Sequence, residues 1–152
     1  MKSNAERCKQ LLSKLNWLPP LLTRIVLGVI FIESGWGKLH DIEKVVAYFT
    51  ELGIPFPGAQ AHFVAATELV AGVMVLTGLM ARLASIPLIA IMTVAIITAK
   101  AADISTFSDI FGFSEFLYIL LLGWLVITGP GFVSLDQFVT KRKNFAKPVL
   151  FL

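Results

Sequence analysis

Long, almost uninterrupted runs of apolar residues dominate the chain. Four of them cover about residues 20–37, 62–80, 83–100 and 113–133, and each is bounded by Gly, Pro or charged residues. A helix that crosses a bilayer needs about 20 mostly apolar residues, with roughly 17 to 25 tolerated. The helices of a soluble bundle would instead show one apolar stripe and one polar face. The pattern therefore predicts an all-α integral membrane protein, built as an antiparallel bundle of four transmembrane helices.

The segment between the first two runs has a different periodicity. In DIEKVVAYFTEL, residues 41–52, apolar residues recur at helical spacing and charged residues occupy the other face. The apolar positions are Ile42, Val45, Val46, Phe49 and Leu52. This amphipathic pattern predicts a short interfacial helix in the first outer loop. Gly53 ends it, and the prolines of GIPFPG lead through an extended turn into the second run.

Composition supports the membrane assignment and narrows the chemistry. Of the 152 residues, 57% are hydrophobic and 15% are charged, whereas about a quarter of a soluble domain is charged. The sequence contains no P-loop, dinucleotide fingerprint, nucleophilic triad or Cys/His metal motif. Its single cysteine, Cys8, cannot form an intramolecular disulfide. We therefore expect no metal site, no tightly held cofactor and no catalytic motif in this chain.

Basic residues are distributed unevenly between the two predicted faces of the membrane. One face holds the N-terminal segment, the turn with Arg82 and the C-terminal tail, where most basic residues lie. The other face holds only Lys38, Lys44 and Lys100, which acidic residues offset. The positive-inside rule then places both termini in the cytoplasm, with the chain crossing a bacterial inner (plasma) membrane several times. The net charge of +3 suits anionic lipid headgroups, so the bilayer is the expected partner and nucleic acid is not.

Three parts follow from this pattern: a basic cytoplasmic N-terminal segment 1–19, a membrane domain 20–137 and a basic cytoplasmic tail 138–152. Basic residues followed by an apolar run are typical of a secretion signal. No small-x-small cleavage pattern follows the run, which favours an uncleaved signal anchor.

The predicted topology places ionisable residues from every helix in the outer half of the bundle. These are Glu33, Lys38, Glu68, Lys100 and Glu115. Such residues cost about 2.5 to 3.5 kcal/mol each at membrane depth and normally face the bundle interior. We expect one buried polar pocket in which Glu33 pairs with Lys100. Glu68 and Glu115 then share Lys38, so that one of them holds a proton. A purely structural role for the cluster is the alternative.

The inner half carries a smaller set of charges. Arg24 opens the first helix, Arg82 opens the third and Asp136 follows the fourth. An Arg–Asp link between these helix ends is expected to be structural. Four glycines are expected to allow close helix packing rather than to serve function: Gly28, Gly35, Gly72 and Gly123.

The order of several motifs resembles the DoxX family over about residues 20–137. The pattern R-x-x-x-G-x-x-F-x-x-x-G-x-x-K-L runs from Arg24 to Leu39, followed by GIPFP, Glu68 with GLMAR, Glu115 and GPG-x-x-SLD. The resemblance implies a four-helix membrane bundle of the DoxX/DoxD and MauE type. Members are associated with redox systems, such as the small subunit of thiosulfate:quinone oxidoreductase and membrane complexes of thiol and oxidative-stress defence. Many relatives have a histidine at the position of Lys100 and a neutral residue at that of Glu33, which favours a compensating pair here.

Two classes of function remain open at this point. The leading hypothesis is a subunit or accessory of a quinone-linked or thiol/sulfur redox system. In it the polar pocket binds a small anion, a quinone headgroup or a partner redox protein. The alternative is a small-molecule or metal-linked transporter or assembly factor, in which the pocket and the helix 41–52 form a gated substrate site. A scaffold for a partner protein or for a homo-oligomer is a further alternative. Because polar residues interrupt the first apolar run early, the sequence favours a pocket over a scaffold.

Overall fold

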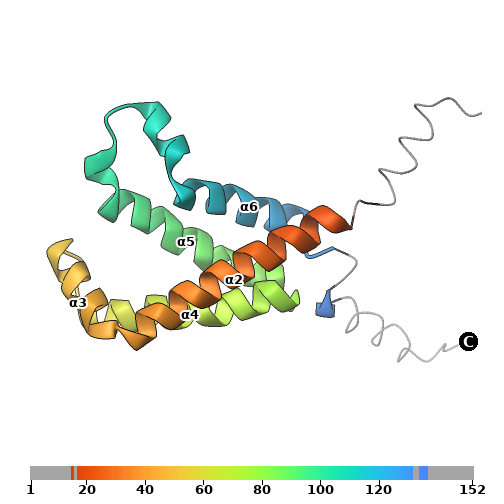
Figure 1. Ribbon diagram of the computed structural model, residues 1–152, viewed down its shortest axis with the longest axis horizontal. Helices are drawn as coiled ribbons and strands as arrows, with labels where there is room; N and C mark the ends of the chain where they lie inside the picture. The colour runs from red at the N-terminus through yellow and green to blue at the C-terminus, as the bar shows by residue number, and fades with distance from the viewer. Residues whose placement is uncertain (1–14, 16, 132–133, 137–152) are drawn as a thin grey trace, which may run out of the picture.

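The computed structural model describes residues 15, 17–131 and 134–136, and all the regular secondary structure of the described chain is helical (Figure 1). Its elements are α2 (Leu18–His40), α3 (Ile42–Glu51), α4 (Pro57–Thr77), α5 (Ala81–Ala99), the 3-10 segments η1 (Ala101–Asp103) and η2 (Phe107–Gly112), and α6 (Ser114–Thr128). Most of the predicted basic N-terminal segment, with Cys8, and the whole predicted tail 138–152 lie outside the described residues.

Three helices, α2, α4 and α5, are long and apolar enough to cross a membrane. They confirm the predicted all-helical membrane class. The fourth predicted run contains α6, an apolar helix of 15 residues, about 22 Å long at 1.5 Å per residue. It ends early because Gly129 adopts a φ of +83°, which stops the helix before Pro130. Four spans therefore remain a prediction. The predicted helix 41–52 is present as α3, and its interfacial location also remains a prediction.

The four long elements run lengthwise side by side, in alternating directions (Figure 1). Helix α2 packs along α4, α5 packs along α6, and contacts between α4 and α5 join the two pairs. Both ends of the described chain lie at one end of the bundle, here called the terminal end. Helix α3 and the 3-10 segments lie at the opposite end, here called the α3 end (Figure 1).

Glycines allow α2 and α4 to approach each other closely. A Cβ added at Gly35 would lie 2.8 Å from the carbonyl oxygen of Ala65, and one added at Gly28 would lie 2.6 Å from the Cβ of Leu76. A Cβ on Gly72 would likewise meet the backbone of α2 at 2.9 Å. The packing role predicted for these three glycines is confirmed. For Gly123 it is wrong, because among the described residues no atom lies within 4 Å of the Cβ it lacks.

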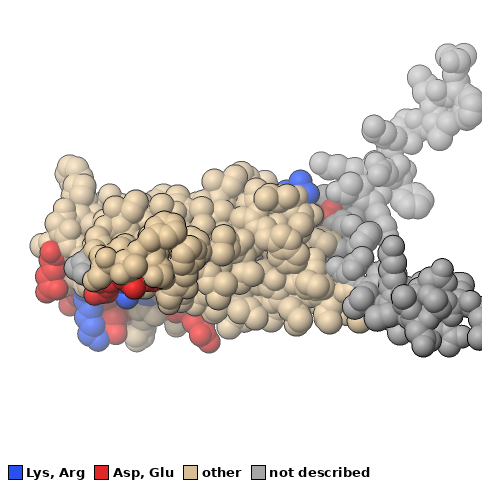
Figure 2. Space-filling view, turned by 90° about the horizontal axis from the view of Figure 1, so that it is seen from above, with Lys and Arg blue, Asp and Glu red and all other residues tan. Residues whose placement is uncertain are grey.

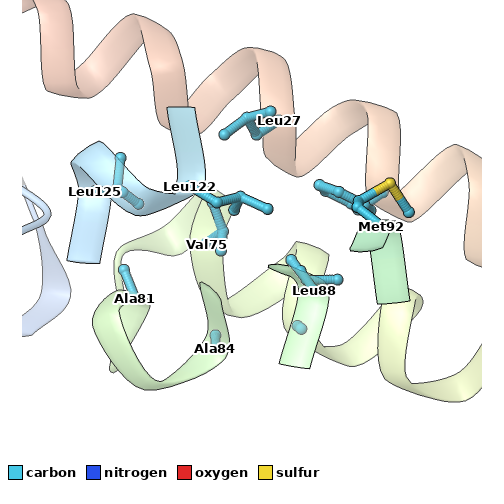
Figure 3. Close-up of a cluster of buried hydrophobic side chains, with 10 residues drawn as sticks. Leu27, Val75, Ala81, Ala84, Leu88, Met92, Leu122 and Leu125 are labelled. Atoms are coloured by element: carbon cyan, nitrogen blue, oxygen red, sulfur yellow. The ribbon is translucent and has the colours of Figure 1, made fainter. Parts of the chain in front are cut away.

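The apolar core lies where all four long helices meet (Figure 3). Leu27 and Phe31 of α2 pack against side chains of α4, α5 and α6, which are Val75, Ala81, Ala84, Leu88, Met92, Leu122 and Leu125. Phe31 also contacts Tyr118 edge-to-face, with ring centroids 5.9 Å apart. This packing fills the middle and the terminal half of the bundle.

Arg24 links three elements near the terminal end. The residue is only 2% exposed. Its Nε donates to the carbonyl oxygen of Val75 at 3.0 Å, Nη2 to that of Leu76 at 2.9 Å and Nη1 to that of Pro130 at 2.9 Å. The carboxylate of Asp136 interacts electrostatically with the guanidinium of Arg24. It also accepts a hydrogen bond from the backbone N–H of Met80 at 2.9 Å. Arg24 therefore links the start of α2 to the end of α4 and to Pro130, and the predicted Arg–Asp link remains a prediction.

Arg82 does not take part in this link. It is exposed, and its guanidinium lies against Gly129. No ion pair joins it to Asp136 in the part of the chain that the structure describes. The reason is its place on α5, whose inward face carries Ala81, Ala84 and Ser85. The expectation that Arg82 contributes to a structural ion pair is therefore wrong.

Replacement of Gly35 by Ala should destabilise the protein, because the added methyl group would collide with the backbone of α4. Overpacking of this kind costs about 1–3 kcal/mol. Gly37→Ala is the matched control on the same helix, since nothing described lies within 4 Å of its missing Cβ. We expect Gly35→Ala to lower the melting temperature in detergent and Gly37→Ala to cause no such decrease. Equal melting temperatures would contradict the close crossing of α2 and α4.

Replacement of Arg24 by Met should lower the free energy of unfolding by about 3 kcal/mol, because one buried and two partly buried carbonyl groups lose their donors. Arg82→Met removes the same charge from an exposed side chain and should cost less than about 1 kcal/mol. Equilibrium unfolding of both variants in mixed detergent micelles measures the difference. A larger loss for Arg82→Met would reverse the assignment of roles to the two arginines.

Candidate functional site

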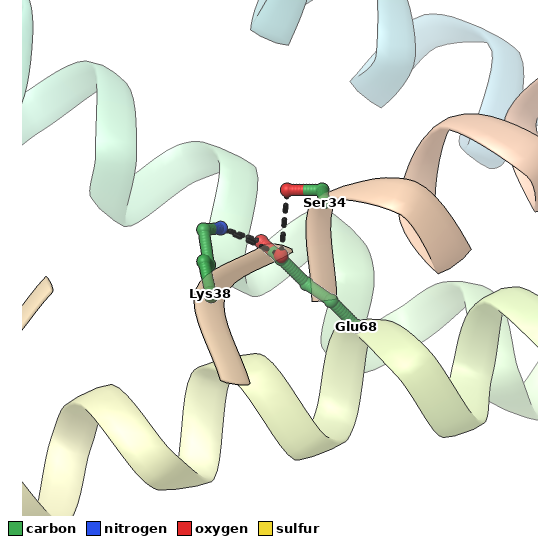
Figure 4. A network of polar contacts seen from close by, with 3 residues as sticks. All are labelled: Ser34, Lys38 and Glu68. Atoms are coloured by element: carbon green, nitrogen blue, oxygen red, sulfur yellow. Dashed lines mark hydrogen bonds and ion pairs between the residues drawn. The ribbon is translucent and has the colours of Figure 1, made fainter. Parts of the chain in front are cut away.

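Glu68, in the middle of α4, is the centre of a buried polar network (Figure 4). Its side chain is fully buried and accepts contacts from two residues of α2. Lys38 Nζ lies 2.5 Å from Oε1 and 2.6 Å from Oε2, and Ser34 Oγ donates to Oε2 at 2.9 Å. Ser34 and Lys38 are four residues apart, so they share one face of α2. An ionised carboxylate only accepts hydrogen bonds, and this one meets donors at both oxygens.

A cavity of about 830 Å³ lies beside this network at the α3 end of the bundle. Its walls come mainly from α3, α4 and α5, and are mostly apolar. Lys38 of α2 and Glu115 of α6 complete the lining. The volume is within the range of about 300–1,000 Å³ that small-molecule sites span, and an apolar lining with a few polar groups is typical of them.

Four of the five residues expected in the outer polar pocket line this cavity: Lys38, Glu68, Lys100 and Glu115. Glu68 alone pairs with Lys38. Glu115 instead accepts a hydrogen bond from Ser114 Oγ at 3.3 Å. The Nζ of Lys100 lies 5.8 Å from the ring centroid of Phe113 and makes no ion pair with any described residue. The expected sharing of Lys38 between two carboxylates is therefore not formed.

Glu33 does not belong to the cavity, and its expected ion pair with Lys100 does not form among the described residues. A helix advances by about 100° per residue. Glu33 follows the buried Phe31 by two residues and so lies about 200° around α2, on the opposite face. It is exposed there. Glu33 and Lys100 lie at a similar depth in the bundle, but their side chains do not face each other.

Two parts of the site were not expected from the sequence. The first is Ser34, whose hydroxyl donates to Glu68. Its spacing of four residues from Lys38 is the signal that would have found it. The second is the place of α3 at the cavity, which the sequence suggested only for a transporter: Val45 and Phe49 of α3 line it, as does Leu52 just after the helix. The sequence assigned this apolar face to the membrane interface, since periodicity shows that a face is buried but not against what.

The rim of the cavity carries an exposed ion pair. Lys44 Nζ lies 2.9 Å from Asp41 Oδ2, and this hydrogen bond, with the positive charge of Lys44, lowers the pKa of Asp41. On the face shown in Figure 2, charged side chains gather at the α3 end, and the middle of the face lacks them apart from one acidic side chain at the lower edge. Such exposed pairs add little stability. They mark where the apolar body of the bundle ends.

Of the cationic side chains that line the cavity, Lys38 and Lys44 each contact a carboxylate. Lys100 contacts no carboxylate among the described residues, so its ammonium group is able to contact a ligand. A mostly apolar cavity lined by ammonium donors suits an amphipathic molecule that presents carbonyl or anionic oxygens. No cluster of His, Cys, Asp or Glu in the described residues fits a metal ion.

Three known proteins are similar to this chain over most of its length. The putative oxidoreductase CatD of Bacillus subtilis is 36% identical over 126 residues, covering 82% of this chain and 89% of the relative. The uncharacterized membrane protein Rv3486 of Mycobacterium tuberculosis is 31% identical, covering 82% and 84%. The inner membrane protein YqjF of Escherichia coli is 28% identical, covering 86% and 99%. No solved structure matches.

The DoxX family profile matches residues 20–101, which include α2, α3, α4 and α5. This range contains Lys38, Glu68 and Lys100, so most of the polar lining of the cavity lies within the residues that the family profile matches. On the match of more than half the chain and the similarity to the Bacillus protein, this chain belongs to the DoxX family of membrane proteins.

Proposed function

We propose that the protein is a membrane subunit or accessory of a redox system, and that its cavity binds the headgroup of a quinone. The observation that carries this proposal is the combination of an apolar cavity of about 830 Å³ with the Lys38–Glu68 pair at its wall. A relative named as a putative oxidoreductase supports the redox association.

The polar groups of the cavity fit a quinone ring. Its two carbonyl oxygens accept hydrogen bonds, and an ammonium group has three N–H donors. Lys38 directs its ammonium group at Glu68 and is still 28% exposed, which leaves it able to donate to a ligand. Lys100 offers a second ammonium group. Tyr48 and Phe49 of α3 line the same cavity and provide aromatic surface for the ring.

The carboxylates give the site a way to handle protons. Reduction of a quinone to a quinol takes up two electrons and two protons. We assign the electrons to a partner redox protein. One proton would come from the ammonium group of Lys38, whose charge the carboxylate of Glu68 balances, and the other from Glu115, which also lines the cavity. Glu68 would also hold Lys38 in place for the headgroup, since both of its oxygens contact that ammonium group.

Binding fits the shape of the cavity better than transport does. A transporter needs a path to the other side of the bundle. Between the cavity and the terminal end lies the packed core, in which Leu27, Leu88 and Leu122 are fully buried. The cavity is a dead end in this conformation, which supports a binding site.

Glu68→Gln should weaken quinone binding at least about tenfold, equivalent to about 1.4 kcal/mol, because it removes the charge that orients Lys38. The probe is a dimethoxy-methyl-benzoquinone with a decyl side chain, titrated calorimetrically into purified, quinone-depleted protein in detergent. Glu33→Gln is the matched control, since it makes the same chemical change on an exposed face and should bind as wild type does. Absence of saturable binding to wild type, or equal binding by Glu68→Gln, would refute the quinone site.

We also propose that the terminal end faces the cytoplasm and the cavity the outer side of an inner membrane. The distribution of basic residues supports this orientation. The two ends of the described chain lie at the same end of the bundle, as an even number of spans requires (Figure 1).

Reporter fusions test this orientation. A fusion in the α4–α5 turn, after Leu79, should report a cytoplasmic location, and one in the η1–η2 connection, after Ser105, a location outside. The opposite pattern would invert the topology, and two fusions on the same side would remove α5 as a span.

A further inference from the structure

We propose, building on the quinone site above, that the cavity opens sideways into the lipid between α4 and α5. The ligand is then a quinone of the membrane pool, whose isoprenoid tail passes through this opening while its headgroup reaches Lys38 and Glu68. This names both the class of ligand and the route by which it enters.

The lining of the cavity reaches the outer surface on both helices. On α4, Glu68 is fully buried, whereas Phe63, which lines the same cavity, is 66% exposed. On α5, Met92 is 8% exposed, whereas Val94 also lines the cavity and is 52% exposed. Walls that pass from buried to exposed positions on two neighbouring helices describe a cavity that is open at the side.

The opening lies at a depth where lipid, not water, surrounds the protein. Val94 precedes Lys100 by six residues, which is about 9 Å along the axis at 1.5 Å per residue. Phe63 follows Pro57, the first residue of α4, by six residues, which is also about 9 Å from the α3 end of that helix. Both helices are long and apolar enough to cross a membrane. The side opening therefore faces the hydrocarbon region.

The chemistry of the opening fits a hydrocarbon tail. Ala90, Ile91 and Val94 of α5 and Phe63 and Val64 of α4 line this side of the cavity, and none of them carries a polar side-chain atom. The charged residues Lys38, Glu68, Lys100 and Glu115 line the same cavity. A mostly apolar lining together with these charged groups matches the two parts of an amphipathic ligand, with the ring inside and the tail toward lipid.

Replacing Val94 by Trp tests the opening, because a bulky side chain at its edge should block the tail. Ile97→Trp is the matched control: it lies on the same helix, is 65% exposed and does not line the cavity. Each protein is reconstituted in lipid nanodiscs and titrated with two probes. One is the dimethoxy-methyl-benzoquinone with a decyl side chain, and the other is the same headgroup without a side chain.

We expect Val94→Trp to weaken binding of the decyl probe about tenfold and to change binding of the tail-less headgroup less than twofold. Ile97→Trp should leave both unchanged. Phe63→Ala, which widens the opening from the α4 side, should speed association of the decyl probe, and it tests the same idea if Val94→Trp fails to fold.

The outcomes separate this inference from the proposed function. If wild type binds both probes while Val94→Trp and Phe63→Ala change neither, the quinone site stands and the side opening is refuted. If Val94→Trp weakens both probes equally, it fills the headgroup site, and the side opening is again refuted. If wild type binds neither probe, the quinone site itself fails, and the side opening fails with it.

Discussion

The structure depends on the close approach of α2 to α4. Gly35 lets the two backbones meet beside Ala65, and Ser34 and Lys38 flank this contact on α2. Because the helices are so close, Glu68 can be fully buried and still meet three donor contacts. A buried carboxylate without such partners would cost several kcal/mol. The close contact at Gly35 thus brings the donors of α2 to Glu68, which offsets the cost of burying this carboxylate, and it fixes the position of the polar site in the bundle.

The two halves of the bundle are built for different purposes. The terminal half is filled by large apolar side chains such as Leu27 and Leu125, and Arg24 links α2 to the end of α4 and to Pro130. At the α3 end, α4 presents small buried residues, Ala61 and Ala65. These two alanines do not line the cavity, whose walls there come from other residues of α4 and from α3 and α5. The closely packed terminal half therefore holds the helices in place around the cavity at the α3 end.

Hydropathy and topology predicted the helices and brought Lys38, Glu68, Lys100 and Glu115 to one end, because the cost of burying charge in lipid decides depth and favours the interior. Depth does not decide direction around a helix. The prediction that Glu33 lines the cavity was therefore wrong, although its position around α2 relative to the glycines of that helix indicated that it faces away. The prediction that Arg82 forms a structural ion pair was wrong for the same reason, because its direction around α5 does not follow from its depth. The early end of α6 depends on the backbone of Gly129, and the choice of partner for α3 is tertiary; neither leaves a periodic signal.

The central claim is that the cavity at the α3 end holds a quinone headgroup beside Lys38 and Glu68. Photolabelling tests it most directly. A quinone with a photoreactive azido group on its ring is bound to the protein in nanodiscs, irradiated, and located by peptide mass mapping. The account predicts labelling within α3 and the facing parts of α4 and α5, suppressed by excess unlabelled quinone. Labelling confined to α6 or to the exposed face of α2, or labelling that excess quinone does not suppress, would contradict it.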